Sequence, residues 1–234
     1  MPEFKNKTMR EIAQNKKFGV IRKLENYYNE YDIMFSRFRD NPINLLEIGV
    51  QKGGSIATWL EYFPKAHIVG IDIDPECKQY ERDGAKIYIG SQEDANFLKK
   101  VEKSEGPFDI VIDDGGHTMK QNLTTFNTLF PLLKEDGIYV VEDLHTSYWG
   151  KFGGGLHKGR TMINRIKHLI DDMHYWATDH PRVNIFKKIK HKLSNTPHGK
   201  ASNVFEETVR SIYIADSICF VRKGKIDKDI TNKI

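Results

Sequence analysis

The chain has 234 residues with 36 Lys or Arg, 32 Asp or Glu and a formal net charge of +4. This length suits one α/β domain with a full core, and no apolar run is long enough to span a membrane. The polar N-terminus lacks the apolar segment of a secretory signal, and two distant cysteines, Cys77 and Cys219, exclude a disulfide framework. We therefore predict a cytoplasmic protein. The basic clusters at 187–192 and 223–234 are short enough to be solvated surface, so we do not expect nucleic-acid binding.

The N-terminal part of the chain is predicted to be helical. Residues 1–18 show no periodicity and should be irregular, whereas apolar residues recur every three or four positions over 20–38. An Asn-Pro pair at 41–42 ends this helix. Its tyrosines leave three interpretations open: packing on a sheet edge, covering a functional site, or contact with a partner subunit in a homo-oligomer. We treat 1–40 as a segment that packs on or caps a single domain at 41–234.

Strands and helices alternate after this segment. The predicted strands lie at 43–48, 67–71, 86–89, 110–112, 138–141, 209–215 and 217–222. The predicted helices open at Gly54 or Ser55 and lie near 96–103, 118–134 and 161–176. This alternation is typical of a parallel sheet with helices on both faces, and the last two strands suit an antiparallel pair at its edge.

Two later segments do not fit a regular element. The run at 150–160 is glycine-rich, and we predict that it is a lid-like mobile loop. Residues 180–203 contain two prolines and a basic cluster, and they are interpreted as a surface excursion.

Two predicted strands end abruptly in acidic pairs, Asp113-Asp114 and Glu142-Asp143. In open α/β sheets the ligand crevice lies beyond the carboxyl ends of the strands. Carboxylates that converge there need a cation to stay ionised, and their oxygens suit Mg²⁺. We therefore predict a metal held by Asp114, Glu142 and Asp143. The side chain of Asp113 should point to the opposite face of its strand.

A glycine-rich turn follows the first predicted strand. Glycines at 49, 53 and 54 let the backbone approach a ligand closely, and Asp72 ends the second strand where a carboxylate can accept ribose hydroxyls. The dinucleotide fingerprint is absent, and Glu47 adds negative charge where a pyrophosphate would lie. These features indicate a cationic, nucleoside-containing cofactor with a free amino group rather than NAD. A tight turn without a ligand is the alternative.

Five segments, in this order and at these separations, resemble class I S-adenosylmethionine-dependent methyltransferases. They are EIGVQKGGS, GIDID, the Gly-Ser-Gln segment, IDDGGH and VEDLHTSYW. More narrowly, they are similar to the metal-dependent sugar O-methyltransferases of the macrocin and mycinamicin type. The similarity covers roughly 41–176 and resumes at SIYIADSICFVRKG, while 180–203 does not align. It implies a Rossmann-like fold with a seven-stranded, mostly parallel sheet and an antiparallel closing strand.

The resemblance also implies roles for individual residues. It places the methionine part of S-adenosylmethionine at Gly49, Gly53 and Ser55, the ribose at Asp72 and the adenine near Ser91 and Gln92. With Glu47 and Asp113 these residues form the predicted cofactor site. The resemblance gives the same three metal ligands as the strand-end argument.

Two histidines are candidates for the chemistry. His117, three residues after Asp114, is the predicted general base, as in the similar enzymes; capping the helix that begins at Thr118 is its alternative role. His145 is a second candidate, either supporting the site or binding substrate. Tyr148 and Trp149 are expected either to stack on a sugar face or to pack against the lid.

We predict an O-methyltransferase that requires Mg²⁺ and S-adenosylmethionine and acts on a sugar or glycoside hydroxyl. Vicinal hydroxyls would chelate the metal, which lowers the pKa of the reacting group. The alternatives are a catechol-type O-methyltransferase acting on a small aromatic diol, and a non-catalytic nucleotide- or glycan-binding module.

Overall fold

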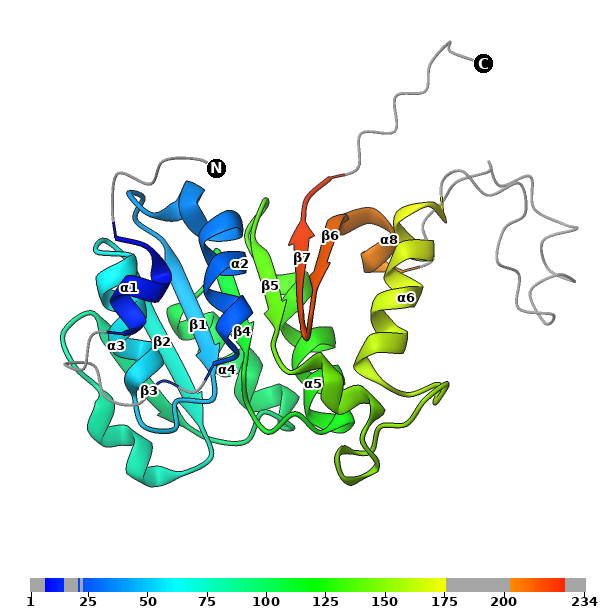
Figure 1. The fold of residues 1–234 in the computed structure, drawn as a ribbon, viewed down its shortest axis with the longest axis horizontal. Coiled ribbons are helices and arrows are strands. Elements are labelled where there is room, and N and C mark those ends of the chain that lie inside the picture. The colour runs from blue at the N-terminus through cyan, green and yellow to red at the C-terminus, as the bar shows by residue number, and fades with distance from the viewer. Residues whose placement is uncertain (1–6, 15–20, 22, 176–202, 226–234) are drawn as a thin grey trace, which may run out of the picture.

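The computed structural model describes residues 7–14, 21, 23–175 and 203–225. They contain one seven-stranded sheet with strand order β3-β2-β1-β4-β5-β7-β6 (Figure 1). The strands are β1 Asn44–Ile48, β2 His67–Asp72, β3 Ala85–Ile89, β4 Ile110–Asp113, β5 Ile138–Val141, β6 Val209–Ala215 and β7 Ile218–Lys223. Strands β1 to β5 pair in parallel, and β7 is antiparallel to both β5 and β6. The predicted mostly parallel sheet with an antiparallel closing pair is therefore confirmed.

Helices lie on both faces of this sheet (Figure 1). They are α1 Met9–Ala13, α2 Glu25–Phe35, α3 Gly54–Tyr62, α4 Ala95–Glu105, α5 Met119–Leu129, α6 Met162–Met173 and α8 Val204–Thr208. Short 3₁₀ helices occur at η2 Ser36–Phe38, η3 Pro75–Tyr80, η4 Phe130–Leu132, η5 Leu144–Tyr148 and η6 Gly150–Phe152. No helix in this described part of the chain is long and apolar enough to cross a membrane.

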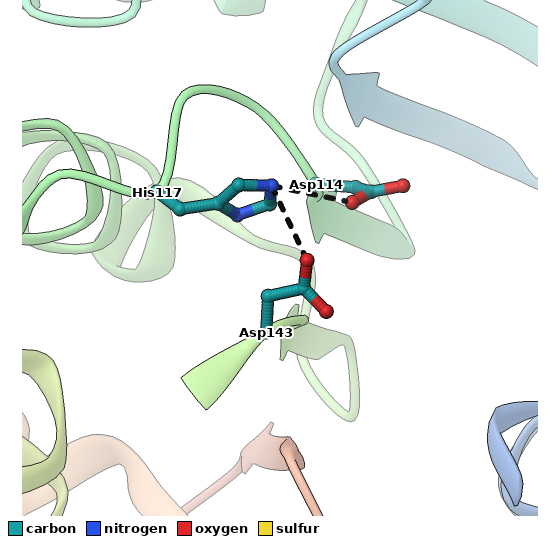
Figure 2. A group of neighbouring side chains, drawn as sticks. All are labelled: Asp114, His117 and Asp143. Atoms are coloured by element: carbon teal, nitrogen blue, oxygen red, sulfur yellow. Dashed lines mark ion pairs between the residues drawn. The ribbon is translucent and has the colours of Figure 1, made fainter. Parts of the chain in front are cut away.

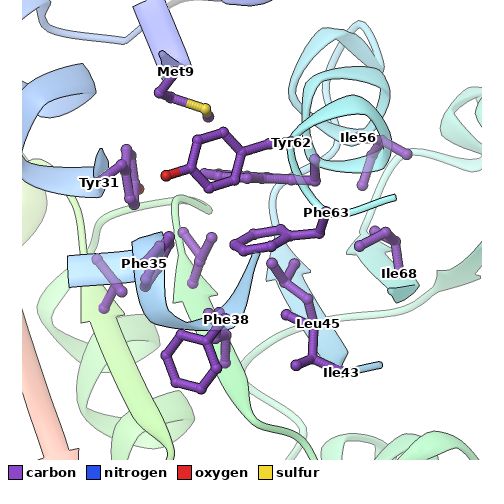
Figure 3. Close-up of a cluster of buried hydrophobic side chains, with 14 of the residues drawn as sticks. Met9, Tyr31, Phe35, Phe38, Ile43, Leu45, Ile56, Tyr62, Phe63 and Ile68 are labelled. Atoms are coloured by element: carbon purple, nitrogen blue, oxygen red, sulfur yellow. The ribbon is translucent and has the colours of Figure 1, made fainter. Parts of the chain in front are cut away.

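Alternation along the strands divides the core into two apolar clusters. In β4, Ile110 and Ile112 pack in the cluster under α1, α2 and α3, whereas Val111 packs in the cluster under α4, α5 and α6. Successive strand side chains point to opposite faces, so each apolar strand supplies both clusters. The first cluster is rich in aromatic residues (Figure 3), and Tyr31 lies edge-on to Trp59 with ring centroids 5.1 Å apart. This packing fixes α2 against the sheet.

The prediction of an irregular start was wrong for residues 9–13, which form α1. Thr8 caps this helix in a reciprocal capping box with Glu11, and the backbone N–H of Met9 donates to the Asp32 carboxylate at 3.0 Å. A helix of five residues is too short to show periodicity, so a tertiary contact decides it. The helix predicted over 20–38 is observed as α2 and η2 but begins only at Glu25; residues 15–20 and 22 lie outside the described part.

The predicted capping box at Thr118 is present: the Gln121 N–H donates to Thr118 Oγ1, and the Thr118 N–H donates to Gln121 Oε1. Helix α5 ends earlier than predicted, at Leu129, where η4 begins and contains Pro131, which has no N–H to donate. The loop at 150–160 contains only η6, and its mobility stays a prediction. Apart from Asn203, the basic excursion at 180–203 lies outside the described residues.

Register brings the strand ends to one edge of the sheet. Asp113 of β4 pairs with Ile48 of β1 and with Val141 of β5. The residues that follow these strands therefore emerge side by side, including Asp114 and Glu142. The strand order also reverses between β1 and β4, and such a switch point is the usual place for a ligand crevice.

Candidate active site

A cavity of about 510 Å³ lies at this edge of the sheet. The turn after β1, the loops after β2, β3, β4 and β5, and two N-terminal residues, Ile21 and Lys23, form its wall. Of the residues predicted from the sequence, the wall contains Gly49, Ser55, Asp72, Ser91, Gln92, Asp114, His117 and Asp143. Five others, Glu47, Gly53, Asp113, Glu142 and His145, do not line it. The sequence therefore located the cavity, while several of the predicted residues stand behind its wall.

The turn after β1 requires glycine at two positions for different reasons. Gly49 has φ +96°, and a Cβ there would lie 2.1 Å from the backbone oxygen of Asp114. Gly53 has φ +70° and precedes α3, and a Cβ there would lie 2.5 Å from the ring of Tyr80. Gly49 thus lets the turn approach the loop after β4 beside the cavity. Gly53 instead packs against Tyr80 of η3, which lines the cavity, and does not line it itself.

Asp72 holds the glycine turn in place. Its Oδ2 accepts the N–H groups of Val50 (2.8 Å) and Gln51 (3.0 Å), and its Oδ1 accepts the N–H of Asp74 at 3.0 Å. Partial burial opposes ionisation, but these backbone donors outweigh it and lower the pKa of Asp72. A carboxylate offers about four acceptor positions, so a ligand hydroxyl can still bind where the side chain lines the cavity.

Glu47 is fully buried behind the turn. It accepts hydrogen bonds from Ser55 Oγ (2.6 Å) and Trp59 Nε1 (3.0 Å), and the ammonium of Lys23 lies 3.7 Å away. Burial raises the pKa of Glu47, and these three partners limit the rise. The positive charge that the sequence led us to expect beside Glu47 is thus supplied in this structure by a lysine of the same chain.

Asp113 supports the cavity from behind. It is 1% exposed, and it accepts hydrogen bonds from Gln92 Nε2 (3.0 Å) and the Tyr139 hydroxyl (3.2 Å). Burial raises the pKa of Asp113 to about 6. Gln92 in turn accepts the N–H of Gly116 at 2.8 Å. Asp113 therefore positions Gln92, which lines the cavity, and points away from Asp114 as strand alternation predicts.

Asp114, His117 and Asp143 converge at the cavity (Figure 2). Each offers a ligand atom within 4.8 Å of the others. His117 Nε2 lies 3.5 Å from Asp143 Oδ2 and 3.9 Å from Asp114 Oδ1. Both His117 and Asp143 have positive φ values, 56° and 53°. Strained backbone of this kind is common at functional sites, where surrounding contacts hold it.

Glu142 is close to this group but is engaged elsewhere. Its Oε1 accepts hydrogen bonds from Lys23 Nζ and from the Tyr31 hydroxyl, while its buried Oε2 has no partner among the described residues. Burial and the nearby Asp114 raise the pKa of Glu142 to about 8, and the bonds from Lys23 and Tyr31 oppose that rise. The structure therefore brings two of the three predicted metal ligands, Asp114 and Asp143, together with the predicted base His117, and Glu142 does not join this group.

Sequence reasoning missed the contribution of the N-terminal segment. Lys23 Nζ lies 2.9 Å from Asp114 Oδ2, and the Lys23 side chain is only 1% exposed. The Tyr27 hydroxyl donates to Asp143 Oδ1 at 2.9 Å and accepts the Asp143 N–H at 3.0 Å. Thus α2 both packs on the sheet, as the simplest interpretation predicted, and reaches the acidic cluster. Its tyrosines were the available signal; nothing in the local pattern singled out Lys23.

His145 lies outside the cavity. Its Nδ1 is hydrogen-bonded to Ser217 Oγ, and its ring centroid is 4.6 Å from that of Trp149. The ring centroids of Trp149 and Phe152 are 6.0 Å apart, and those of Phe152 and His117 are 6.4 Å apart. These rings form an aromatic row from the cavity to the surface, where Trp149 is 43% exposed.

Comparisons with known proteins agree with this geometry. Residues 46–144 match a family model described as Methyltransferase domain. The chain is 41% identical over 163 residues to 8-demethyl-8-(2-methoxy-alpha-L-rhamnosyl)-tetracenomycin-C 3'-O-methyltransferase from Streptomyces olivaceus, covering 64% of this chain and 42% of that protein. It is 31% identical over 222 residues to mycinamicin VI 2''-O-methyltransferase from Micromonospora griseorubida, covering 91% and 51%.

The fold matches a solved structure as well. The MycE methyltransferase from the mycinamycin biosynthetic pathway, in complex with Mg, SAH and mycinamycin VI, superposes with a TM-score of 0.79 at 27% identity. The match covers 98% of this chain and 58% of that one. The chain spans about half the length of the curated relatives it matches. The resemblance predicted from the sequence is confirmed: residues 46–144 match the methyltransferase-domain model, the chain has the fold of the MycE methyltransferase, and the two curated relatives described above are named as O-methyltransferases.

Proposed function

We propose that this chain is an O-methyltransferase that uses S-adenosylmethionine and Mg²⁺ to methylate a hydroxyl of a sugar or glycoside. The observation that carries the proposal is the convergence of Asp114, His117 and Asp143 on the cavity of a methyltransferase domain. Relatives that are named as sugar O-methyltransferases support the substrate class. The MycE complex with Mg and SAH supports the cofactor and the ion.

The residues present fit a hard divalent cation. Carboxylate oxygens are the ligands that Mg²⁺ prefers, and it usually keeps positions for water or substrate. Asp114 and Asp143 lie at the cavity, and Glu142 has a buried oxygen without a partner in the described structure. An unsatisfied buried carboxylate oxygen is costly unless it meets a cation or donor. We assign Asp114, Glu142 and Asp143 as the residues that would hold Mg²⁺.

The cavity also fits a nucleoside-containing cofactor. Gly49 brings backbone to the cavity, Asp72 offers free acceptor positions for ribose, and Ser91 and Gln92 lie on the same wall. We assign these residues and Ser55 to S-adenosylmethionine. Glu47, Gly53 and Asp113 contribute by holding the turn and Gln92 from behind, because none of the three lines the cavity.

His117 is assigned as the general base. When bound, the ion would lower the pKa of a coordinated acceptor hydroxyl, and S-adenosylmethionine would supply the methyl group. His117 lines the cavity, and its Nε2 would accept the hydroxyl proton. The carboxylates of Asp143 and Asp114, 3.5 Å and 3.9 Å away, would stabilise the resulting imidazolium.

The aromatic row supports an acceptor with an extended apolar face. Trp149 and Tyr148 are 43% and 44% exposed, and Phe152 connects Trp149 to His117. An aromatic ring can bury the C–H face of a sugar while its edge stays in water. We assign Trp149 and Tyr148 to acceptor binding. A homo-oligomer and a cytoplasmic setting stay predictions.

The test is methyl transfer from labelled S-adenosylmethionine to a panel of deoxysugar glycosides and catechols, with Mg²⁺ or with EDTA. We expect methylated glycosides only with Mg²⁺. His117→Ala should lower turnover by about 10²–10⁴-fold and leave binding of S-adenosylhomocysteine intact. His168→Ala is the matched control, since this histidine is exposed on α6 and does not line the cavity, and it should change turnover far less. Transfer to catechols alone, or unchanged turnover in His117→Ala, would overturn the assignment.

A further inference from the structure

The ammonium of Lys23 lies among three carboxylates, those of Glu47, Asp114 and Glu142. Lys23 Nζ contacts Asp114 Oδ2 at 2.9 Å and Glu142 Oε1, and it lies 3.7 Å from Glu47 Oε1. Its side chain is 1% exposed. The ring centres of Tyr31 and Trp59 lie 5.8 Å and 5.9 Å from the ammonium. Desolvating an ammonium this fully is costly, so the carboxylates must compensate for that cost.

Lys23 also changes which residues can hold an ion. Asp114, His117 and Asp143 place ligand atoms within 4.8 Å of one another, but among the described residues Glu142 does not join this group. Glu142 Oε1 is turned to Lys23 and Tyr31, and Oε2 has no partner in the part of the chain described. With Lys23 in place, one of the three carboxylates assigned to the ion is therefore engaged by the ammonium.

An ammonium and a divalent ion cannot share these carboxylates without strong repulsion. Both would lie within a few ångströms of the same Asp114 carboxylate, and water screens the charges only weakly because Lys23 is buried. Lys23 lies two residues before α2, whose N-cap residue Leu24 makes no side-chain capping bond. The long side chain of Lys23 can therefore withdraw from the carboxylates while the buried Tyr27 and Tyr31 keep α2 packed on the sheet.

We propose that Lys23 is a built-in cation that competes with the divalent ion for Asp114 and Glu142. Without the ion, the ammonium of Lys23 neutralises these carboxylates and keeps the buried cluster stable. When the ion binds, the ammonium leaves and Glu142 joins Asp114 and Asp143. This inference rests on the proposed function, because the ion is the one assigned to that site.

The first test measures Mn²⁺ affinity by electron paramagnetic resonance. Lys23→Met keeps most of the length of the side chain and removes the competing charge, so it should bind Mn²⁺ at least about tenfold more tightly, because no ammonium competes for its carboxylates. Lys23→Arg keeps the charge and should stay near the wild-type affinity. Lys52→Met is the matched control: Lys52 is an exposed lysine on the same cavity wall, and its loss should have little effect. Equal or weaker binding by Lys23→Met would overturn the proposal.

A second test uses the wild-type chain, so it stands even if Lys23→Met folds poorly. An amine-labelling reagent followed by mass spectrometry should find Lys23 protected without the ion and labelled when Mg²⁺ saturates the site. Lys52 should be labelled in both states. Mn²⁺ binding with Lys23 still protected would overturn the competition and leave the proposed function standing. No Mn²⁺ binding by any variant would overturn the metal site and, with it, both proposals.

Discussion

Asp72→Asn tests separately two roles of this carboxylate: holding the glycine turn, and binding the cofactor as proposed above. The wild-type Oδ2 accepts from Val50 and Gln51, and Oδ1 accepts from Asp74. Bonds to a charged acceptor contribute about 1.5–3 kcal/mol each and neutral ones about 1 kcal/mol. In the variant the side-chain amide oxygen is a neutral acceptor for Val50 and Gln51, and the amide NH₂ faces the N–H of Asp74, which loses its acceptor. We therefore expect the free energy of unfolding to fall by about 2–3 kcal/mol, which corresponds to a melting point lower by about 4–12 °C.

Urea unfolding at several pH values measures this difference. The pKa of Asp72 is lowered in the folded protein, so its contribution is present above the ordinary carboxyl pKa and is lost as the pH falls below about 4. The gap between wild type and Asp72→Asn should therefore be constant from pH 7 to pH 5 and close in acid. Titration with S-adenosylhomocysteine then reports the ligand role separately. If the variant were as stable as wild type at pH 7, Asp72 would not hold the turn, and our reasoning would be refuted.

Two further substitutions test the turn and the sheet. Gly49→Ala would place a Cβ 2.1 Å from the backbone oxygen of Asp114 at a φ of +96°, so it should lower the free energy of unfolding by at least about 2 kcal/mol and weaken S-adenosylhomocysteine binding; normal values for both would contradict the close approach. Burial opposes ionisation of Glu105, but hydrogen bonds from Lys86 and Tyr88 hold its pKa at about 2. Glu105→Gln should therefore cost about 1–2 kcal/mol at pH 7 in urea unfolding, less than the whole pKa shift implies because water screens exposed partners such as Lys86, and this cost shrinks as the pH falls from about 4.5 toward 2. A cost independent of pH would mean that charge is not the cause.

The fold was largely predictable because its signals are local. Each buried strand is a short apolar run, and Thr118 with Gln121 marks the start of α5 without reference to the rest of the chain. The short helix α1 was missed because five residues cannot show a helical period, and the contact of Met9 with Asp32 lies 23 positions away. The early end of α5 follows from Pro131 in the turn after it.

The site was predictable to the extent that it depends on strand ends. Parallel strands carry their carboxyl ends to one edge, so Asp114, His117 and Asp143 could be expected to converge, and they lie together. The sequence did not show which of the residues near the strand ends point their side chains into the cavity. Glu47 and Asp113 are adjacent to the cavity in sequence, yet packing turns both away from it.

The sequence by itself determined the strand and helix order, the glycine turn, and the acids at the ends of β4 and β5, because these depend on period, turn chemistry and sheet direction. Only the tertiary structure decided what neutralises those acids. Lys23 is 91 positions from Asp114 and 119 from Glu142. No local pattern encodes a contact over that separation; it exists because the packing of α2 on the sheet carries Lys23, two residues before the helix, to the strand ends.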